Sequence, residues 1–395
     1  MTDIGGPLGK PPAPIPGHFT RLASLRSSDS VHSFEAKQML REQTNEEPAR
    51  WSRGTLARIP KCPACGSPAR AGEPIVSADH RTDLGEDLWT FHRCANCRSL
   101  YLDPRPDSES LPRAYENYYT HQNDNERPPN SGLGGFLWRL IHGYLNRRFG
   151  MSRQPALNGG YRLFHLLPIF RLKLDHYGRH LYADSYPRRG RLLDVGCGNG
   201  TFLLRAKEMG WQVYGLEPDE KAAQVARAQG LPVESGNLGR FPEAWRGTFD
   251  VLTISHVIEH VDSPLEDLKH AFSLLRPNGL IWIVSPNPDS IGAHFFRSAW
   301  RGLHAPCHLC IPSGRKLKEL LSDAEFVNIK AHKRGAHAKM ICKESAEVCR
   351  AQRTFVPRIK ALVGPAVQVI IDLSATFFTG LAEETVITAN RPQKN

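Results

Sequence analysis

The sequence predicts an α/β protein, with a mostly parallel sheet that carries helices on both faces and a small zinc-ribbon-like module in front of it. Three observations predict this fold. From residue 191 onward, apolar stretches of strand length alternate with stretches of helical period. The strand at residues 191–195 runs into a glycine-rich turn and then a helix. Ahead of these elements, two Cys-x-x-Cys pairs have the residue pattern of a zinc site.

The composition favours a globular protein of a reducing compartment. A length of 395 residues allows two or three domains, and a hydrophobic content of 40% suits a soluble chain. The N-terminus lacks the charged-then-apolar pattern of an export signal. Four of the nine cysteines stand in the two Cys-x-x-Cys pairs, which indicates reduced thiols that hold a metal. We therefore expect a cytoplasmic protein, with room for peripheral contact at the inner face of the membrane.

Composition and period divide the chain into five segments. Residues 1–58 are rich in Pro, Gly, Ser and Arg, and we expect them to be disordered. The zinc-binding module is expected at residues 59–107, and a basic, partly helical connector at residues 108–187. The sheet-forming core is expected at residues 188–334. Residues 335–395 are expected to add a helical insertion and a C-terminal strand that completes the sheet.

The elements of the core are predicted from apolar period and turn residues. The expected strands cover residues 191–195, 212–217, 249–255, 280–285, 326–332 and 384–389. The expected helices cover residues 200–209, 219–229, 264–275 and 313–322, the last capped by Ser313. Residues 361–382 are long enough to span a membrane, but Asp372 near their centre favours a buried or interfacial helix pair.

A basic band precedes the core. Residues 127–191 hold twelve Lys and Arg residues against only Asp175 and Asp184. This excess favours an anionic partner, such as phosphates, nucleic acid or anionic lipid, and the alternative is a solvated linker face. Apolar residues at helical spacing predict an amphipathic helix around residues 137–145, and Pro168 bends or divides a second apolar stretch. Such helices lie on a membrane surface or cap a neighbouring domain.

The segment Leu192–Gly200 predicts a cofactor site. Glycines let the backbone turn sharply and approach a ligand without Cβ clashes; they are Gly196, Gly198 and Gly200. Thr201 stands where the third glycine of a dinucleotide-binding motif would lie, and Asp194 would repel a pyrophosphate. S-adenosylmethionine has no phosphate and carries an ammonium group, so it fits an acidic turn better. Glu217, at the end of the next strand, can accept hydrogen bonds from both ribose hydroxyls.

These residues also carry a family resemblance. Residues 192–200 resemble motif I of class I methyltransferases, and Gly215-Leu216-Glu217-Pro218 resembles their next motif. Residues 249–261 resemble the acid–histidine block of ubiquinone-type and sugar-type small-molecule methyltransferases. The resemblance implies a seven-stranded Rossmann-like sheet and S-adenosylmethionine as cofactor. The further cofactor-binding residues that it implies are Asn237, where the family often has an acidic residue, Leu238, Ser255 and His256.

The two cysteine pairs predict a structural zinc site. Cys62 and Cys65 form the first pair, and Cys94 and Cys97 form the second, with 28 residues between the pairs that a hairpin can fill. Four thiolates supply the tetrahedral sulfur set of a closed zinc site. The second pair and the residues that follow it resemble methyltransferases with an N-terminal zinc module. Some of those act on nucleotide-linked sugars or in polysaccharide and antibiotic pathways.

Two pairs of residues are candidates for catalysis. Glu259 and His260 follow a strand end, and the corresponding pair serves base chemistry in the sugar C-methyltransferases that the chain resembles. His304 and His308 fall in the loop after the strand that ends at Ser285, where acceptor-binding elements are placed. The alternatives are that the first pair shapes the cofactor pocket and that the second pair packs in the core.

The sequence therefore predicts a class I S-adenosylmethionine-dependent methyltransferase that acts at carbon or oxygen of a small-molecule acceptor, such as a sugar, a lipid-linked compound or a natural-product intermediate. One alternative is an RNA methyltransferase with a zinc-ribbon RNA-binding module. Against it, the strand that ends at Ser255 lacks the Asn/Asp-Pro-Pro-aromatic motif of base amino-methyltransferases. The other alternative is a non-catalytic zinc-ribbon binding protein, but Asp194, the glycine turn and Glu217 are intact.

Overall fold

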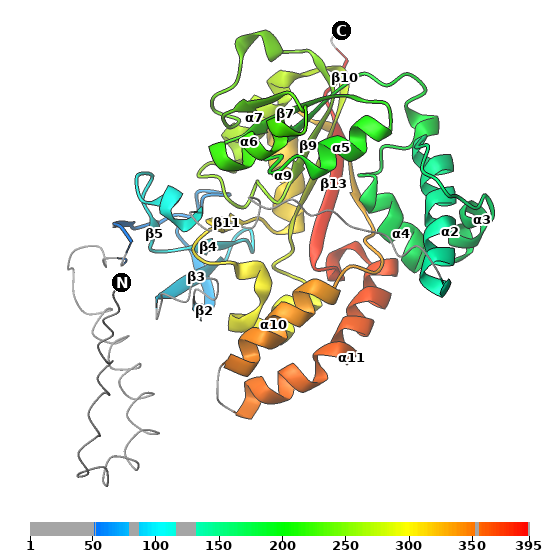
Figure 1. Cartoon of the computed structure of the whole chain (residues 1–395). Helices are drawn as coiled ribbons and strands as arrows, with labels where there is room; N and C mark the ends of the chain where they lie inside the picture. Colours follow the sequence, from blue (N-terminus) through cyan, green and yellow to red (C-terminus); the bar gives the residue numbers. More distant parts are fainter. Residues whose placement is uncertain (1–50, 52, 79–86, 116–131, 352–354, 394–395) are drawn as a thin grey trace, which may run out of the picture. The chain divides into compact units, whose positions relative to one another are not determined.

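The main sheet has seven strands in the order β12-β13-β10-β9-β6-β7-β8 (Figure 1). Its strands are β6 (Arg191–Val195), β7 (Gln212–Glu217), β8 (Val233–Ser235), β9 (Phe249–Ser255), β10 (Leu275–Pro286), β12 (Val327–His332) and β13 (Glu384–Asn390). β6 to β10 pair in parallel, and β13 runs antiparallel to β10 and β12. This order confirms the predicted seven-stranded Rossmann-like sheet. The chain switches sides between β6 and β9, so ligands are expected beyond the carboxyl ends of these strands.

The structure is a computed structural model, and it describes residue 51 and residues 53–78, 87–115, 132–351 and 355–393. Most of the segment that the sequence predicts to be disordered, residues 1–58, lies outside the described residues.

Five helices of the described residues belong to the core. They are α5 (Thr201–Glu208), α6 (Glu220–Ala228), α7 (Pro264–Leu274), α8 (Ile291–Phe296) and α9 (Gly314–Asp323). Three of them, α6, α8 and α9, begin at a side-chain cap. The Asp219 carboxylate accepts the N–H of Lys221 at the start of α6, and the Ser313 hydroxyl accepts the N–H of Lys316 at the start of α9. Short 3-10 turns are η1 (Leu111–Tyr115), η3 (Ala183–Ser185), η4 (Glu243–Trp245), η5 (Arg297–Ala299), η6 (Arg301–Leu303) and η7 (Thr379–Leu381).

The cysteine module folds as a four-stranded antiparallel sheet in the order β11-β4-β3-β2, beside a two-stranded pair of β1 and β5. The strands are β1 (Leu56–Ala57), β2 (Arg70–Ala78), β3 (Leu88–Cys94), β4 (Leu100–Leu102), β5 (Arg105–Pro106) and β11 (Cys310–Ile311). The pairing of β2 with β3 confirms the expected hairpin between the cysteine pairs. β11 comes from the loop after β10, so the core itself supplies the fourth strand of the module.

A helical layer completes the structure. Its helices are α2 (Gly132–Phe149), α3 (Gly159–Leu166), α4 (Pro168–Tyr177), α10 (Lys339–Ala351) and α11 (Phe355–Phe377) (Figure 1). Pro168 begins α4, which confirms that the second apolar stretch is divided there. The Tyr144 hydroxyl of α2 donates to Asp175 of α4 at 2.7 Å, so the two helices are joined inside the layer. Within the described residues, no helix is both long and apolar enough to cross a membrane.

Ser313 connects the cysteine module to the core through two hydrogen bonds. Its hydroxyl donates to the carbonyl of Cys97 at 2.7 Å while it caps α9. Ser313→Ala should lower the free energy of unfolding by about 1–3 kcal/mol, because a cap and a buried hydrogen bond are lost together. Urea denaturation measures this loss. Ser322→Ala, on an exposed residue of the same helix, is the control and should change stability by less than about 0.5 kcal/mol.

Candidate functional site

The glycine-rich turn after β6 has the backbone that the motif requires. Gly196, Gly198 and Gly200 have φ angles of 65°, 55° and 82°, in the left-handed region that side chains disfavour. A Cβ atom on Gly196 would lie 2.3 Å from Cγ2 of Val257, so space also excludes a side chain there. The turn therefore presents backbone without side chains at the point where the strand order of the sheet reverses.

Glu217 holds this turn in place. Its Oε2 accepts the N–H of Gly198 at 2.7 Å, and its Oε1 accepts the N–H of Asp219 at 3.0 Å. Burial raises the pKa of the Glu217 carboxyl, although these two backbone donors oppose the shift. A carboxylate oxygen has two acceptor sites, so each oxygen keeps the capacity for one more donor, such as a ribose hydroxyl.

Asp194, in β6, forms a buried ion pair with Arg179. The hydroxyl of Thr253, in β9, donates to the same Asp194 oxygen at 2.7 Å. The Arg179 guanidinium also lies over the ring of Phe202, 3.4 Å from its centroid. No sequence motif indicates Arg179, because it follows α4 outside any local pattern. Only the fold brings it to the acidic turn.

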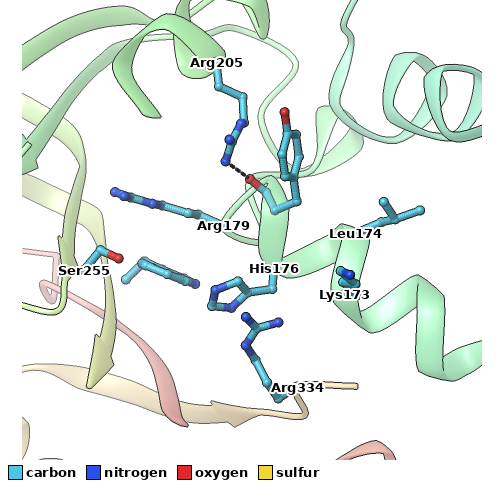
Figure 2. A pocket seen from close by; sticks show the side chains of 9 residues that line it. Lys173, Leu174, His176, Arg179, Arg205, Ser255 and Arg334 are labelled. Carbon is cyan, nitrogen blue, oxygen red and sulfur yellow. Dashed lines mark hydrogen bonds between the residues drawn. The ribbon is translucent and has the colours of Figure 1, made fainter. Parts of the chain in front are cut away.

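A pocket of about 260 Å³ lies beside this ion pair (Figure 2). Four of its lining residues carry cationic side chains: Lys173, Arg179, Arg205 and Arg334. Figure 2 shows that these side chains reach the pocket from different elements, with the His176 ring among them. Burial, followed by the charge of Arg334, holds the pKa of His176 well below its usual range, so that ring is neutral. The pocket therefore attracts an anionic group.

The pocket and the turn fit S-adenosylmethionine. The cofactor's amino-acid end pairs a carboxylate with an ammonium, and here the guanidinium of Arg179 lies next to the carboxylate of Asp194. Arg205 and Arg334 line the same pocket. Nη1 of Arg334 is buried and has no hydrogen-bond partner among the described residues, so the pocket contains an unmet donor. Together with the remaining acceptor sites of Glu217, these groups match the charges and hydroxyls of the cofactor.

Two of the expected cofactor-binding residues, Asn237 and Leu238, have local roles. Oδ1 of Asn237 accepts the N–H of Gly239 at 3.0 Å, so this side chain closes its own turn. Leu238 is buried in the core cluster that also holds Leu216 of β7. Both residues lie in the segment that follows β8.

The two candidate catalytic pairs come together in one histidine cluster, which we define as Glu259, His260, His304 and His308. The rings of His260 and His308 are 4.6 Å apart, and those of His304 and His308 are 4.8 Å apart. The backbone carbonyl of Glu259 accepts the N–H groups of Leu309 and Cys310, which ties the loop after β9 to the loop after β10. Glu259, His260 and His308 have ligand atoms within 4.8 Å of one another, a set that could hold a metal ion.

The proton positions on two of these rings follow from their partners. Nδ1 of His260 lies 2.9 Å from the carbonyl oxygen of Cys307, and Nδ1 of His308 lies 2.8 Å from that of Gly302. A carbonyl only accepts hydrogen bonds, so each Nδ1 carries a proton. In the neutral rings Nε2 therefore carries the lone pair, and Nε2 of His308 lies 3.4 Å from Nδ1 of His304.

His256 connects the histidine cluster to the pocket. Its Nδ1 lies 3.2 Å from Oε1 of Glu259, and its Nε2 lies 3.3 Å from Oε1 of Glu384. Glu384 in turn pairs with Arg334 of the pocket at 2.5 Å. Burial opposes protonation of His256, but the two carboxylates outweigh it and raise its pKa well above the usual range. Ser255, the preceding residue, lines the pocket.

Tyr115 lies in the expected connector, residues 108–187, and no sequence pattern indicated it as a site residue. Its hydroxyl lies 2.8 Å from Nδ1 of His260, and it donates to the carbonyl of Cys307 at 3.3 Å. It ends η1, directly after the cysteine module. Tyr118 and Tyr119, from the same expected segment, lie outside the described residues.

The four predicted zinc ligands converge. The Sγ atoms of Cys62 and Cys97 are 3.7 Å apart, and those of Cys65 and Cys94 are 3.5 Å apart. All four thiols are free of disulfides and lie within 4.8 Å of one another. Tetrahedral ligands with zinc–sulfur bonds of about 2.3 Å lie about 3.8 Å apart, so this set fits zinc closely.

Known proteins resemble the core of the chain. Residues 173–331, which begin after the cysteine module, match a family model described as a methyltransferase domain. A ubiquinone biosynthesis O-methyltransferase of Nitrosospira multiformis is 32% identical over 166 residues, which are 37% of this chain and 69% of that protein. The protein of the same name from Bordetella avium is 31% identical over 139 residues, 31% of this chain and 57% of that protein.

The chain was also compared with solved structures. A SAM-dependent methyltransferase from Archaeoglobus fulgidus is 20% identical, with a TM-score of 0.37, and the match covers 51% of this chain and 86% of that chain. Of the two curated relatives named above, the chain spans 57% of the length of the Bordetella avium protein and 69% of the length of the Nitrosospira multiformis protein.

Glu217 gives the first test of the site. Glu217→Ala removes the acceptor for the ribose hydroxyls and should weaken S-adenosylmethionine binding by about 1–3 kcal/mol, as measured by calorimetry. Glu220→Ala removes a carboxylate that is exposed on α6, and its affinity should stay unchanged. Equal affinities of Glu217→Ala and the wild type would refute the role of Glu217.

The cysteine set gives the second test. Purified protein should carry about one zinc per chain, and Cys97→Ser should lose most of the metal and melt at a lower temperature. Cys342→Ser changes a buried thiol outside the cluster and should keep the metal. Metal analysis that finds no zinc in protein prepared without chelators would show that the site is not a zinc site.

Proposed function

Because the chain belongs to the class I S-adenosylmethionine-dependent methyltransferases, we propose that it methylates a small-molecule acceptor, a sugar, lipid-linked or natural-product intermediate, at carbon or oxygen. The observation that carries this proposal is the histidine cluster, which is linked through His256 and Glu384 to the cationic pocket. Methyl transfer needs a base close to the cofactor when the acceptor must lose a proton.

The cofactor supplies a methyl group that is already activated on a sulfonium. The chain therefore has to bind and orient the cofactor and the acceptor, and to accept a proton from the acceptor. In this proposal Arg179 and Arg205 bind the carboxylate of the cofactor's amino-acid end, and Asp194 orients its ammonium. Glu217 accepts the ribose hydroxyls. The remaining proposed contacts are Gly196, Gly198, Gly200, Asn237, Leu238, Ser255 and His256.

His260 is the proposed base. Its Nε2 takes the proton of the acceptor while the acceptor's electron pair forms the new bond to the methyl carbon. The electron pair of the broken carbon–sulfur bond stays on sulfur, so charge and atoms balance. The hydroxyl of Tyr115 and the carbonyl of Cys307 both lie at Nδ1, so the proposed proton transfer uses the other ring nitrogen, Nε2. Glu259, whose Oε2 is buried without a hydrogen-bond partner among the described residues, stabilises the cationic ring.

The cysteine module supports the acceptor side in this proposal. The zinc held by Cys62, Cys65, Cys94 and Cys97 stabilises the sheet that receives β11 and leads to Tyr115. Its role is structural, because four thiolates leave zinc no open position for a substrate.

His260→Ala tests the base. Turnover should fall by about 10²–10⁴-fold, the usual contribution of a general base, while S-adenosylmethionine affinity stays nearly unchanged. The wild-type rate should rise with pH as the imidazole loses its proton, and this rise should disappear in the variant. His270→Ala, a histidine on α7 outside the cluster, should keep both the rate and the pH profile.

The reverse pattern would reject this role. Weaker cofactor binding with a nearly normal rate at saturation would indicate that His260 shapes the cofactor pocket and is not the base. Retention of both rate and pH profile would move the search for the base to His304 and His308.

A further inference from the structure

Exposed large apolar side chains gather on the helical layer. Of the nineteen among the described residues, seventeen lie on α2, α3, α4, α10, α11 or the turns beside them. Leu88 and Val327 are the two that lie elsewhere. Scattered single apolar residues are normal on a monomer, whereas a concentration on one set of contacting helices marks an interaction surface. The proposed function does not use this distribution of exposed side chains, so an inference from it goes beyond that function.

α11 carries the clearest part of this surface. Ile359, Leu362, Ile370, Leu373 and Phe377 recur at helical spacing and are 44–80% exposed. On the opposite side of the helix, Ile371 and Ala375 are completely buried. At a rise of about 1.5 Å per residue, the apolar stripe runs for about 27 Å.

α4 extends the surface beside α11. Its Phe170 is 48% exposed, and Leu166, at the end of α3, is 80% exposed. The two helices are held in register by the segment after β12, because Arg334 N–H donates to the carbonyl of Ala375 and Ala336 N–H donates to that of Ile169. We call the exposed apolar side chains of α3, α4 and α11 the apolar face.

The exposed charges on α2, α3, α4 and α11 have one sign, whereas α10, which packs against α11, carries Glu344 and Glu347 beside Lys343 and Arg350. The sequences of α2, α3, α4 and α11 contain only two acidic residues, Asp175 and Asp372, and both are buried. Arg139, Arg147 and Arg162 are exposed on α2 and α3. A second copy of this chain would bring like charges to such a contact, and like charges across an interface are unfavourable. Anionic lipid offers both an apolar layer and negative charge.

We infer that the apolar face docks on the surface of an anionic lipid bilayer. The side chains of α11 and α4 enter the boundary between headgroups and acyl chains, and the arginines of α2 and α3 contact the lipid phosphates. The helices lie along the surface, because none in the described residues can cross a membrane. α4 also lines the cofactor pocket with Lys173 and Leu174, so the docked helix and the site share one element.

Vesicle co-sedimentation of the full chain tests this docking. The wild type should sediment with vesicles of equal parts phosphatidylcholine and phosphatidylglycerol, and not with phosphatidylcholine alone. Raising the salt from about 0.1 M to about 0.5 M should weaken binding, because screened charges attract less. Phe170→Glu combined with Leu373→Glu should lower the bound fraction at least tenfold at limiting lipid. Leu88→Glu combined with Val327→Glu changes equally exposed apolar residues off the face and should bind like the wild type.

Two measurements separate the outcomes. Calorimetry with S-adenosylmethionine on both double variants shows that they are folded, and it tests the cofactor site independently of docking. Light scattering reports the oligomeric state. Absence of wild-type sedimentation with anionic vesicles overturns the inference, as does equal binding of the two double variants. A wild-type dimer that Phe170→Glu with Leu373→Glu dissociates also overturns it, because the occupant is then a second copy.

Discussion

The pairing of β11 with β4 is the contact on which the arrangement of the site depends. Cys310 and Ile311 leave the core and pair with Tyr101 and Leu100, so one sheet contains strands from both parts of the chain. The same short segment supplies the N–H groups that the carbonyl of Glu259 accepts. The loop with His304 and His308 is therefore fixed to the loop with Glu259 and His260 by backbone bonds. Separation of the module from the core would break the pairing of β11 with β4, and this pairing fixes the segment that directly follows His308.

Two buried carboxylates fix the backbone around the proposed cofactor site. Asp194 and Glu217 are almost completely buried, and a buried carboxylate is costly unless donors surround it. Arg179 and Thr253 provide those donors for Asp194, and two backbone N–H groups provide them for Glu217. The partners of Glu217 belong to the glycine turn and to the start of α6. The carboxylates that suit the ligand therefore also hold the backbone that approaches it.

The sequence predicted what local pattern encodes. Strand and helix periods, the glycine turn and the two cysteine pairs lie within short windows, and the structure has these elements where they were expected. Contacts between residues that are far apart in the sequence could not be predicted. The meeting of Glu259 with His308 depends on β11, and the roles of Tyr115, Arg179 and Glu384 depend on helices and strands that carry no motif. Such residues become visible only after folding brings them together.

The charges within the histidine cluster favour His260 over His308 as the proton acceptor. His256 is held protonated between Glu259 and Glu384, and Arg334 completes a set of two cations and two anions. Burial, followed by the charge of His260, holds the pKa of His308 well below its usual range, so His308 stays neutral. A proton on it would add an unbalanced buried charge, which is costly. His260 is half-buried, and water can solvate its cation as that cation forms. The burial that keeps His308 neutral therefore favours the half-buried His260 as the proposed proton acceptor.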